Sequence, residues 1–292
     1  MNQDKIDQHY KSLKSGYQRP ELMDSIFNAQ GLMNHAEAYA NLYQNQEPYP
    51  YIALQNILPP EWAEQVEKDF PLPNQLDFYR YDNPLEKKMA FDQVYRLPDS
   101  VKNCLYQLNS PVFLNFLEKL TGIEGLIPDP YFRGGGVHLI PKGGKLDVHV
   151  DFNIHPKLKL HRRLNVLVYL NKKWKEEWDG DLQIWEGFKD NRGDHHLLKL
   201  HDRIYPNFNT FVCFNTSEKS YHGFPNKVKC PANIARKSIA LYYYTAEAPK
   251  GEADPHSTVF VKRPTDNDEL DELRKERAKG RISSNVDSDV TS

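Results

Sequence analysis

Eight short β-type runs between Gly134 and Thr245 restrict the fold of this chain more than any other feature of its sequence. Gly, Pro, Asn and Asp separate the runs, which read GGVHLI, KLDVHVDF, RLNVLVYL, DLQIW, HLLKL, TFVCFN, SYHGF and SIALYYYT. Short strands at this spacing indicate an all-β sandwich or barrel, and eight strands suit a jelly roll. We therefore predict a mainly β fold with flanking α-helices: a double-stranded β-helix (jelly roll) with the N-terminal helices packed outside it.

Helix and strand signals precede these runs. Residues 51–54 predict a short strand, and Pro60, placed at the first position of a helix, predicts a helix that continues to about residue 70. Ser110 is expected to cap a second helix, because apolar residues at helical spacing follow it as far as Gly122.

Polarity divides the chain into three regions. Residues 1–46 are polar, contain two helix-compatible stretches (20–30 and 34–44) and predict an N-terminal helical extension. Residues 47–265 contain the β-type runs and form the main domain. Residues 266–292 are charged and lack aromatic side chains. They predict a charged, partly disordered tail, with a helix in its first half and disorder from residue 281 onward.

Composition excludes several classes of protein. The 292 residues include 38 Lys and Arg against 40 Asp and Glu, a net charge of −2, so the strong basic field of nucleic-acid-binding proteins is missing. No run of 18 apolar residues and no apolar signal segment is present, so we expect neither a membrane span nor secretion. Three cysteines outside any CxxC motif argue against a disulfide scaffold or a thiolate zinc site. We predict a cytoplasmic protein without nucleic-acid or membrane partners, and leave the oligomeric state open.

His149 and Asp151 are separated by one residue in the second run. On a strand, residues i and i+2 point to the same face, so an imidazole and a carboxylate converge there. A third ligand must come from another strand, and His222, in the next-to-last run, is the best candidate. Two histidines and one carboxylate on one face of an octahedron leave three positions open, as in the facial triad of non-haem Fe(II) oxygenases. Taken alone, the HxD pattern is also compatible with a hydrogen-bonded structural pair.

Arg236 and Ser238 begin the last run and alternate onto one face of it. A guanidinium holds a carboxylate through a two-pronged fork, and a hydroxyl adds another donor. The pair therefore predicts a binding site for the distal carboxylate of a diacid whose 2-oxo acid end chelates the iron. For Arg236 alone, the alternative is a surface ion pair.

Together these motifs resemble those of the Fe(II)/2-oxoglutarate-dependent dioxygenase superfamily, on its prolyl 4-hydroxylase-like branch. The similarity covers roughly residues 134–245, is weaker over 48–70, and is carried by HVDFN, RRLNVLVYLNKKWKEEWDGDLQIW, HGFP and RKS. It implies that residues 47–265 are the dioxygenase domain. Two features differ from the prolyl hydroxylases: the basic residue is Arg where collagen-type enzymes have Lys, and it follows the last histidine at a longer spacing than usual.

The resemblance also implies cofactors and site residues. By this resemblance, the metal ligands are His149, Asp151 and His222. The cofactor-binding residues are Arg236, Ser238, Tyr169 and Asn165. Fe(II), 2-oxoglutarate and O2 are implied, with ascorbate as a candidate reductant; 2-oxoglutarate becomes succinate and CO2 while a C–H bond is oxidised. Because related halogenases replace the carboxylate that Asp151 retains, halogenation is not expected.

Substrate recognition is less constrained by the sequence. The candidate substrate residues are His138, Asn153, Arg162 and Tyr79. Residues 76–92 are compatible with a lid over the site or with an ordinary surface segment. The basic stretch 155–163 suits an acidic substrate or a solvated face, and His138 has a structural role as its alternative. We expect residues 76–92 and 152–163 to shape the pocket.

Three functions fit these observations. The first is hydroxylation, oxidative cyclisation or desaturation of a small molecule, such as an amino acid or a natural-product intermediate. The second is hydroxylation of a protein or peptide, of the prolyl type; the absence of a recognisable docking domain favours the first. The third, from another class, is a non-catalytic metal-binding jelly-roll protein, which would be expected to lack a complete triad or carboxylate grip.

Overall fold

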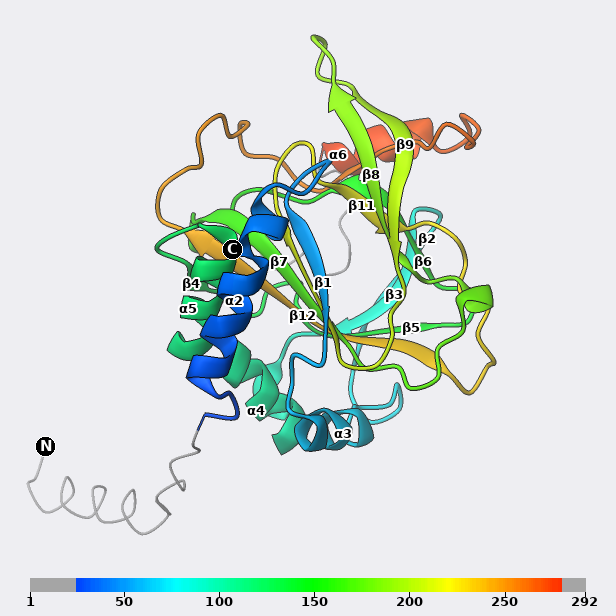
Figure 1. Ribbon diagram of the computed structural model, residues 1–292. Coiled ribbons are helices and arrows are strands. Elements are labelled where there is room, and N and C mark those ends of the chain that lie inside the picture. Colours follow the sequence, from blue (N-terminus) through cyan, green and yellow to red (C-terminus); the bar gives the residue numbers. More distant parts are fainter. Residues whose placement is uncertain (1–24, 280–292) are drawn as a thin grey trace, which may run out of the picture.

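The computed structural model describes residues 25–279 and contains a β-barrel with helices packed on its outside (Figure 1). The strands are β1 Tyr51–Gln55, β2 Tyr79–Asn83, β3 Glu86–Phe91, β4 Ile127–Pro128, β5 Gly136–Pro141, β6 Lys145–Val150, β7 His161–Tyr169, β8 Leu182–Lys189, β9 His195–Ile204, β10 Thr210–Asn215, β11 Tyr221–Phe224, β12 Ala235–Thr245 and β13 Val259–Phe260. They join in the order β1-β10-β7-β12-β5-β3-β6-β11-β8-β9, with β2 beside β3, β4 beside β12 and β13 beside β6.

The eight predicted runs are all strands, β5 to β12, and their pairing is that of a jelly roll. The first pairs with the eighth, the second with the seventh, the third with the sixth and the fourth with the fifth, all antiparallel. This nesting brings together segments that are far apart in the sequence. The predicted double-stranded β-helix is confirmed, and it explains how a late histidine can reach an early HxD pattern.

Side chains of β7 and β12 alternate between two environments. Val166 and Val168 of β7, with Ile239 and Leu241 of β12, point outward into the main hydrophobic core. The intervening residues point into the barrel, where Tyr169 belongs to a second, smaller apolar cluster. Because strand side chains alternate with period two, one sequence builds both the helix-facing core and the barrel interior.

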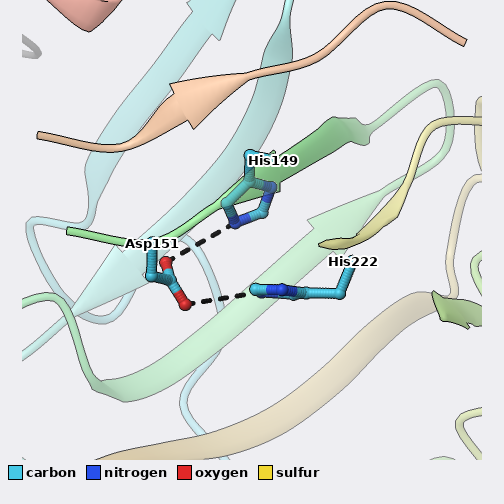
Figure 2. A group of neighbouring side chains, drawn as sticks. All are labelled: His149, Asp151 and His222. Atoms are coloured by element: carbon cyan, nitrogen blue, oxygen red, sulfur yellow. Dashed lines mark ion pairs between the residues drawn. The ribbon is translucent and has the colours of Figure 1, made fainter. Parts of the chain in front are cut away.

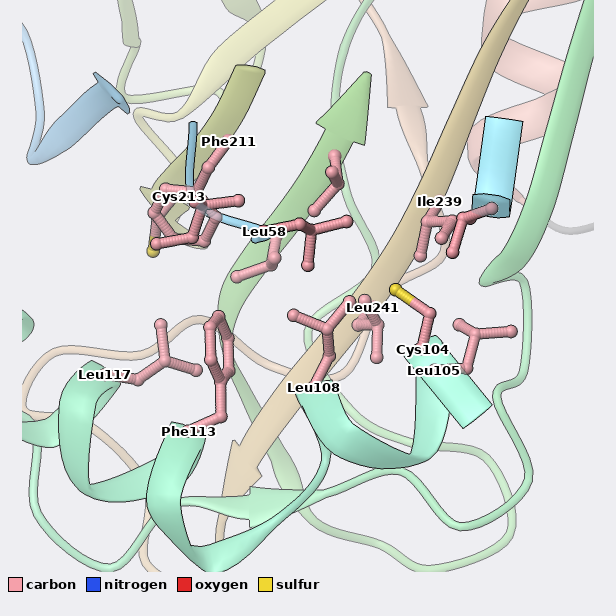
Figure 3. Close-up of a cluster of buried hydrophobic side chains, with 14 of the residues drawn as sticks. Leu58, Cys104, Leu105, Leu108, Phe113, Leu117, Phe211, Cys213, Ile239 and Leu241 are labelled. Atoms are coloured by element: carbon pink, nitrogen blue, oxygen red, sulfur yellow. The ribbon is translucent and has the colours of Figure 1, made fainter. Parts of the chain in front are cut away.

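The helices lie against the outer face of the barrel sheet. They are α2 Ala29–Gln44, α3 Pro60–Lys68, α4 Asp99–Leu108, α5 Pro111–Thr121 and α6 Asp271–Ala278, with short 3-10 turns at Val94–Arg96 and Glu176–Trp178. Figure 3 shows α4 and α5 side chains, among them Leu108 and Phe113, facing Phe211, Ile239 and Leu241 of the strands. Burying this apolar surface is the main stabilising contribution to the fold.

The helix ends follow the predicted chemistry. Pro60 occupies the first turn of α3. Ser110 precedes α5, and its hydroxyl oxygen accepts a hydrogen bond from the Phe113 amide at 3.4 Å. Gly122 ends α5 in the left-handed conformation, with φ of 72°, which glycine adopts without strain. Of the two helix-compatible stretches, residues 34–44 lie within α2, whereas residues 25–28 are not helical and residues 20–24 lie outside the described part.

Two regions differ from the expectation or were missed by it. Residues 76–92 do not form a separate lid: most of them form β2 and β3, which extend the barrel sheet beside β5 and β6. The helix α4 was not predicted, although Val101, Cys104 and Leu105 recur at helical spacing and are fully buried. Apolar side chains at positions i, i+3 and i+4 are the signal that identifies such a helix.

The charged C-terminal region contributes a helix, α6, that is attached to the barrel. Arg277 donates a hydrogen bond to the buried Glu86 carboxylate at 2.7 Å, and Arg274 is 6% exposed. The predicted helix in the first half of this region is therefore present, while the predicted disorder from residue 281 falls outside the described residues. Among the described helices none has the length and apolar character needed to cross a membrane.

Candidate metal centre

Three side chains that could ligate a metal ion meet inside the barrel (Figure 2). The ligand atoms of His149, Asp151 and His222 all lie within 4.8 Å of one another. His149 Nε2 is 3.6 Å from Asp151 Oδ1, and His222 Nε2 is 3.4 Å from Asp151 Oδ2. Atoms bound at about 2.1 Å to a common ion, at right angles to one another, lie ~3 Å apart. The three side chains are therefore close to the spacing that one ion requires.

Strand pairing explains this convergence. β6 and β11 are antiparallel neighbours, and His222 is directly opposite His149 in their register. Strand β6 ends at Val150, so Asp151 lies one residue beyond it, still on the side of His149. The HxD pattern thus presents one ligand from the strand and one from its end, while the jelly-roll pairing supplies the third.

Backbone hydrogen bonds orient both imidazole rings. His149 Nδ1 lies 2.8 Å from the Asp147 carbonyl oxygen, and His222 Nδ1 lies 2.8 Å from the Ser220 carbonyl oxygen. A carbonyl oxygen only accepts, so each Nδ1 carries the hydrogen and donates it. In a neutral ring with this hydrogen bond the lone pair is on Nε2, and both Nε2 atoms face Asp151, the arrangement in which a histidine binds a metal.

The protonation states suit the same purpose. Burial lowers the pKa of His222 to about 3, and the neighbouring His149 adds to this effect while Asp151 opposes it. Burial alone would raise the pKa of Asp151, but Arg162 and the two histidines outweigh burial and hold this pKa well below its usual range. The centre offers a neutral imidazole and a carboxylate at neutral pH, which are the forms that bind metal ions.

A second polar group lies on the inner face of β7 and β12. The Arg236 side chain is 3% exposed; its Nε donates to the Gly180 carbonyl oxygen at 2.7 Å and its terminal nitrogen donates to the Tyr169 hydroxyl at 2.9 Å. The guanidinium also lies between the rings of Tyr169 and Phe224. Among the described residues, no acidic side chain forms an ion pair with Arg236; Asp181, the nearby acid, pairs with Arg203 at 2.7 Å instead.

Ser238 adds an unsatisfied group beside this arginine. It is 1% exposed, it faces Tyr169 in the register of β12 and β7, and its hydroxyl has no hydrogen-bond partner among the described residues. A buried guanidinium without an acid and a buried hydroxyl without a partner are both costly unless a ligand completes them. The two groups therefore fit a carboxylate such as that of 2-oxoglutarate.

Asn165, expected at the co-substrate, contacts the metal centre instead. Its side-chain nitrogen donates to Asp151 Oδ2 at 2.6 Å. Arg162, expected at the substrate, donates to the same oxygen at 3.1 Å and is 2% exposed. Both residues thus lie at the carboxylate of the triad.

A cavity of about 260 Å³ borders the metal centre at Asp151. Asn153 lies in its wall and ties the loop of residues 246–258 to the barrel, since its amide nitrogen donates to the Ala253 carbonyl oxygen at 2.9 Å. Two acidic residues of the wall pair with histidines: Glu252 with His161, and Glu218 with His256, each at 2.5 Å. The wall is therefore polar and carries charges of both signs.

The other substrate candidates lie elsewhere. Tyr79 is on β2, where its hydroxyl lies 3.5 Å from the Gln93 amide, and His138 is on β5, where its Nε2 lies 3.0 Å from the Gly134 carbonyl oxygen. Asn153 and Arg162 line the cavity beside Asp151, whereas Tyr79 and His138 do not.

Sequence reasoning missed the contribution of the loop formed by residues 246–258. This loop follows the last barrel strand and carries no motif. Its one chemically distinctive residue is His256, which pairs with Glu218 in the cavity wall.

A larger and more open depression, of about 680 Å³, lies on the outer side of the barrel near Phe70 and Lys237. None of the triad residues lines it. We place the functional site at the smaller cavity, because that cavity borders the candidate ligands.

Comparisons with known proteins agree with this geometry. Residues 135–244 match the model of the 2OG-Fe(II) oxygenase superfamily. The match contains the HxD pattern, His222, Arg236 and Ser238. No curated protein matches the chain in sequence.

Several solved structures are similar to the chain at low sequence identity. A prolyl 4-hydroxylase from Phytophthora capsici is 15% identical, with a TM-score of 0.50 over 92% of this chain and 79% of its own. A Trichoplax adhaerens prolyl hydroxylase, solved with a hypoxia-inducible-factor peptide, is 19% identical with a TM-score of 0.47, over 76% and 95% of the two chains. HygX from Streptomyces hygroscopicus, solved with iron bound, is 13% identical with a TM-score of 0.46, over 71% and 86%. At 15% identity, the likeness to the Phytophthora capsici structure concerns the fold alone.

Proposed function

We propose that this chain, a 2-oxoglutarate-dependent dioxygenase of the 2OG-Fe(II) oxygenase superfamily, oxidises a C–H bond of a small polar molecule held beside Asp151. Its cofactors are Fe(II), 2-oxoglutarate and O2. Hydroxylation, cyclisation and desaturation share the same first hydrogen abstraction and are all compatible with this proposal. The bound iron and 2-oxoglutarate supply the oxidation, and the protein supplies ligation, orientation and a shielded cavity.

The proposed iron ligands are His149, Asp151 and His222. Support comes from the two Nε2 lone pairs directed at one carboxylate and from the hydrogen bonds of each Nδ1 to a backbone carbonyl. Two imidazoles and a carboxylate form the facial donor set of non-haem iron oxygenases, which leaves positions for co-substrate and O2.

The proposed partner of the 2-oxoglutarate C5 carboxylate is Arg236, assisted by Ser238 and Tyr169. The strongest single support is that the Arg236 guanidinium is buried without an acid among the described residues, next to an unpartnered Ser238 hydroxyl. A dianion whose far carboxylate reaches these donors would neutralise the buried charge. Asn165 is the exception within the predicted set, because its amide is engaged with Asp151.

The size and wall of the cavity favour a small substrate over a peptide. About 260 Å³ is below the range typical of drug-sized ligands, which begins near 300 Å³. The loop 246–258 covers one side and is tied down by Asn153 and by the ion pairs of Glu252 and His256. An extended peptide would need this side open.

Succinate release tests the proposal. Purified protein with Fe(II) and 2-oxoglutarate is screened against amino acids, acidic metabolites and proline-containing peptides, with oxidised product identified by mass spectrometry. We expect stimulation by a small amino acid or acid and no stimulation by peptides. Turnover of a peptide alone would replace the small-molecule proposal by peptidyl hydroxylation, and loss of 2-oxoglutarate without any Fe(II) requirement would overturn the assignment of the metal centre.

A further inference from the structure

The buried arginine at the start of β7 has an unusual position for a charged residue. Arg162 is 2% exposed and its guanidinium stacks between the rings of Tyr242, at 3.6 Å, and Phe152, at 4.5 Å. Removing a charge from water costs several kcal/mol unless partners replace the lost hydration. The partners of this guanidinium therefore indicate why the sequence keeps it there.

Those partners are two residues, one of which belongs to the metal triad. Arg162 donates to Asp151 Oδ2 at 3.1 Å, and its Nε donates to Asn165 Oδ1 at 3.0 Å; a second donor of the guanidinium also contacts Asn165 Oδ1. Asn165 in turn donates to Asp151 Oδ2 at 2.6 Å. The three side chains form a closed triangle of hydrogen bonds.

The triangle distinguishes the two oxygens of Asp151. Oδ2 lies 3.4 Å from His222 Nε2 and accepts hydrogen bonds from both Arg162 and Asn165. Oδ1 lies 3.6 Å from His149 Nε2 and accepts no hydrogen bond from Arg162 or Asn165, so it is the oxygen that remains available to a metal ion. A carboxylate held through one oxygen can present the other to a metal at a fixed angle. We propose that Arg162 and Asn165 are positioning residues that hold Asp151 through Oδ2 so that Oδ1 binds the iron.

This inference rests on the proposed metal centre and gives both residues a role different from the substrate and co-substrate roles expected from the sequence. The chain spacing is consistent with it. Arg162 and Asn165 are three residues apart on β7, with a bulge in its pairing to β12 near Tyr244. A bulge redirects side chains, so a strand that would otherwise send the two residues to opposite faces can direct both toward Asp151.

Metal binding by the apoprotein tests the proposal without any substrate. Co(II), whose visible absorption reports coordination geometry, and Fe(II) are titrated into wild-type, Arg162→Gln, Arg162→Lys and Asn165→Ala proteins, and thermal unfolding of each apoprotein is recorded. Arg163→Gln is the matched control, because the neighbouring Arg163 donates to Thr245 at 3.3 Å and not to the triad.

We expect a loss of metal affinity of about 10–100-fold in Arg162→Gln and Asn165→Ala, as for other residues that orient metal ligands, with an altered Co(II) spectrum. Arg162→Lys keeps the charge but lacks the fork, so its spectrum should also change. Arg163→Gln should match wild type. Asn165→Ala removes no charge and keeps the proposal testable if an Arg162 variant does not fold.

Two outcomes would overturn these assignments separately. Wild-type affinity and spectrum in the folded Arg162 and Asn165 variants would overturn the positioning role, whatever their melting temperatures. Full metal binding by His149→Ala in the same assay would overturn the metal centre itself.

Discussion

The two faces of β12 differ in chemistry, although successive side chains of the strand point alternately to one face and the other. Outward, Ile239, Leu241 and Tyr243 are at most 2% exposed and join the core that the helices cover. Inward, Arg236 and Ser238 are equally buried but leave hydrogen-bonding capacity unused among the described residues. The outer face is satisfied by packing, and we propose that a bound ligand satisfies the inner face.

This contrast separates stability from chemistry within a single strand. Changes on the outer face should lower the free energy of unfolding and leave ligand binding intact in the folded molecules. Changes on the inner face should weaken ligand binding at little cost to the fold, because a polar group that lacks its ligand contributes little to stability. The predictions below test that separation, from the largest expected effect to the smallest.

Changes at the proposed metal ligands, which come from β6, its end and β11 inside the same barrel, should show the largest effect. His149→Ala is expected to reduce bound Fe(II) from one ion per chain to near zero, because two ligands seldom hold a labile dication. The free energy of unfolding of the apoprotein should change by about 1 kcal/mol or less. Metal analysis after anaerobic loading measures this, with the exposed His196 replaced by Ala as the control for the number of histidines. Equal iron in the two variants would contradict the assignment.

A change on the outer face of β12 should lower the stability of the fold and leave iron binding intact. Leu241→Ala removes a core side chain that is 2% exposed, and is expected to lower the free energy of unfolding by about 2–5 kcal/mol. Urea unfolding gives this value, and iron analysis on the folded fraction should still give one ion per chain. If Leu241→Ala weakened iron binding as strongly as His149→Ala, the outer core and the barrel interior would not be independent.

Adjacent residues of β12 allow a matched comparison of the two faces. Arg236→Gln removes the buried charge, so the 2-oxoglutarate concentration needed for half-maximal succinate release should rise about 30-fold, the equivalent of ~2 kcal/mol. Lys237→Gln removes a charge from the outer face, where Lys237 pairs with Glu67 at 2.9 Å, and should leave this requirement unchanged. A similar rise in the 2-oxoglutarate requirement of both variants would mean that any loss of positive charge on β12 weakens binding, and would contradict a specific role of Arg236.

The ion pair in the cavity wall should give the smallest effect. Burial alone would lower the pKa of His256, but its hydrogen bond with Glu218 raises this pKa above its ordinary value. The pair therefore stabilises the fold fully below the ordinary histidine pKa, and this contribution is lost as the pH rises through the higher folded value. Glu218→Gln should remove the contribution of this pair to the pH dependence of the free energy of unfolding. That contribution is about 1 kcal/mol at most. An NMR titration in which the His256 pKa does not fall in Glu218→Gln would contradict the pairing.

The sequence predicted the parts of the molecule that depend on local patterns. Alternating apolar runs identified β5 to β12, and Ser110 and Gly122 marked the ends of α5 because caps are local chemistry. The residues of the HxD pattern and His222 were identified as neighbours, since same-face spacing on a strand and jelly-roll pairing both follow from general rules. Their role as iron ligands stays a prediction.

Contacts between distant segments were harder to predict. Nothing in the pattern around Arg162 or Asn165 indicates that both side chains meet Asp151, because that contact depends on a bulge and on the path of the loop after β6. The loop of residues 246–258 was missed for the same reason: its attachment to Asn153 is a hydrogen bond to backbone carbonyls, which leaves no trace in residue type.

The central claim is that the barrel interior binds Fe(II), through His149, Asp151 and His222, together with 2-oxoglutarate, whose far carboxylate contacts the inner face of β12. Anaerobic addition of both to the wild-type protein, followed by visible absorption, tests it most directly, because iron chelated by a 2-oxo acid absorbs where neither component does alone. We expect this absorption to saturate at one iron per chain and to disappear in His149→Ala. Absence of the absorption at saturating Fe(II) and 2-oxoglutarate, or the same absorption in His149→Ala, would contradict the claim.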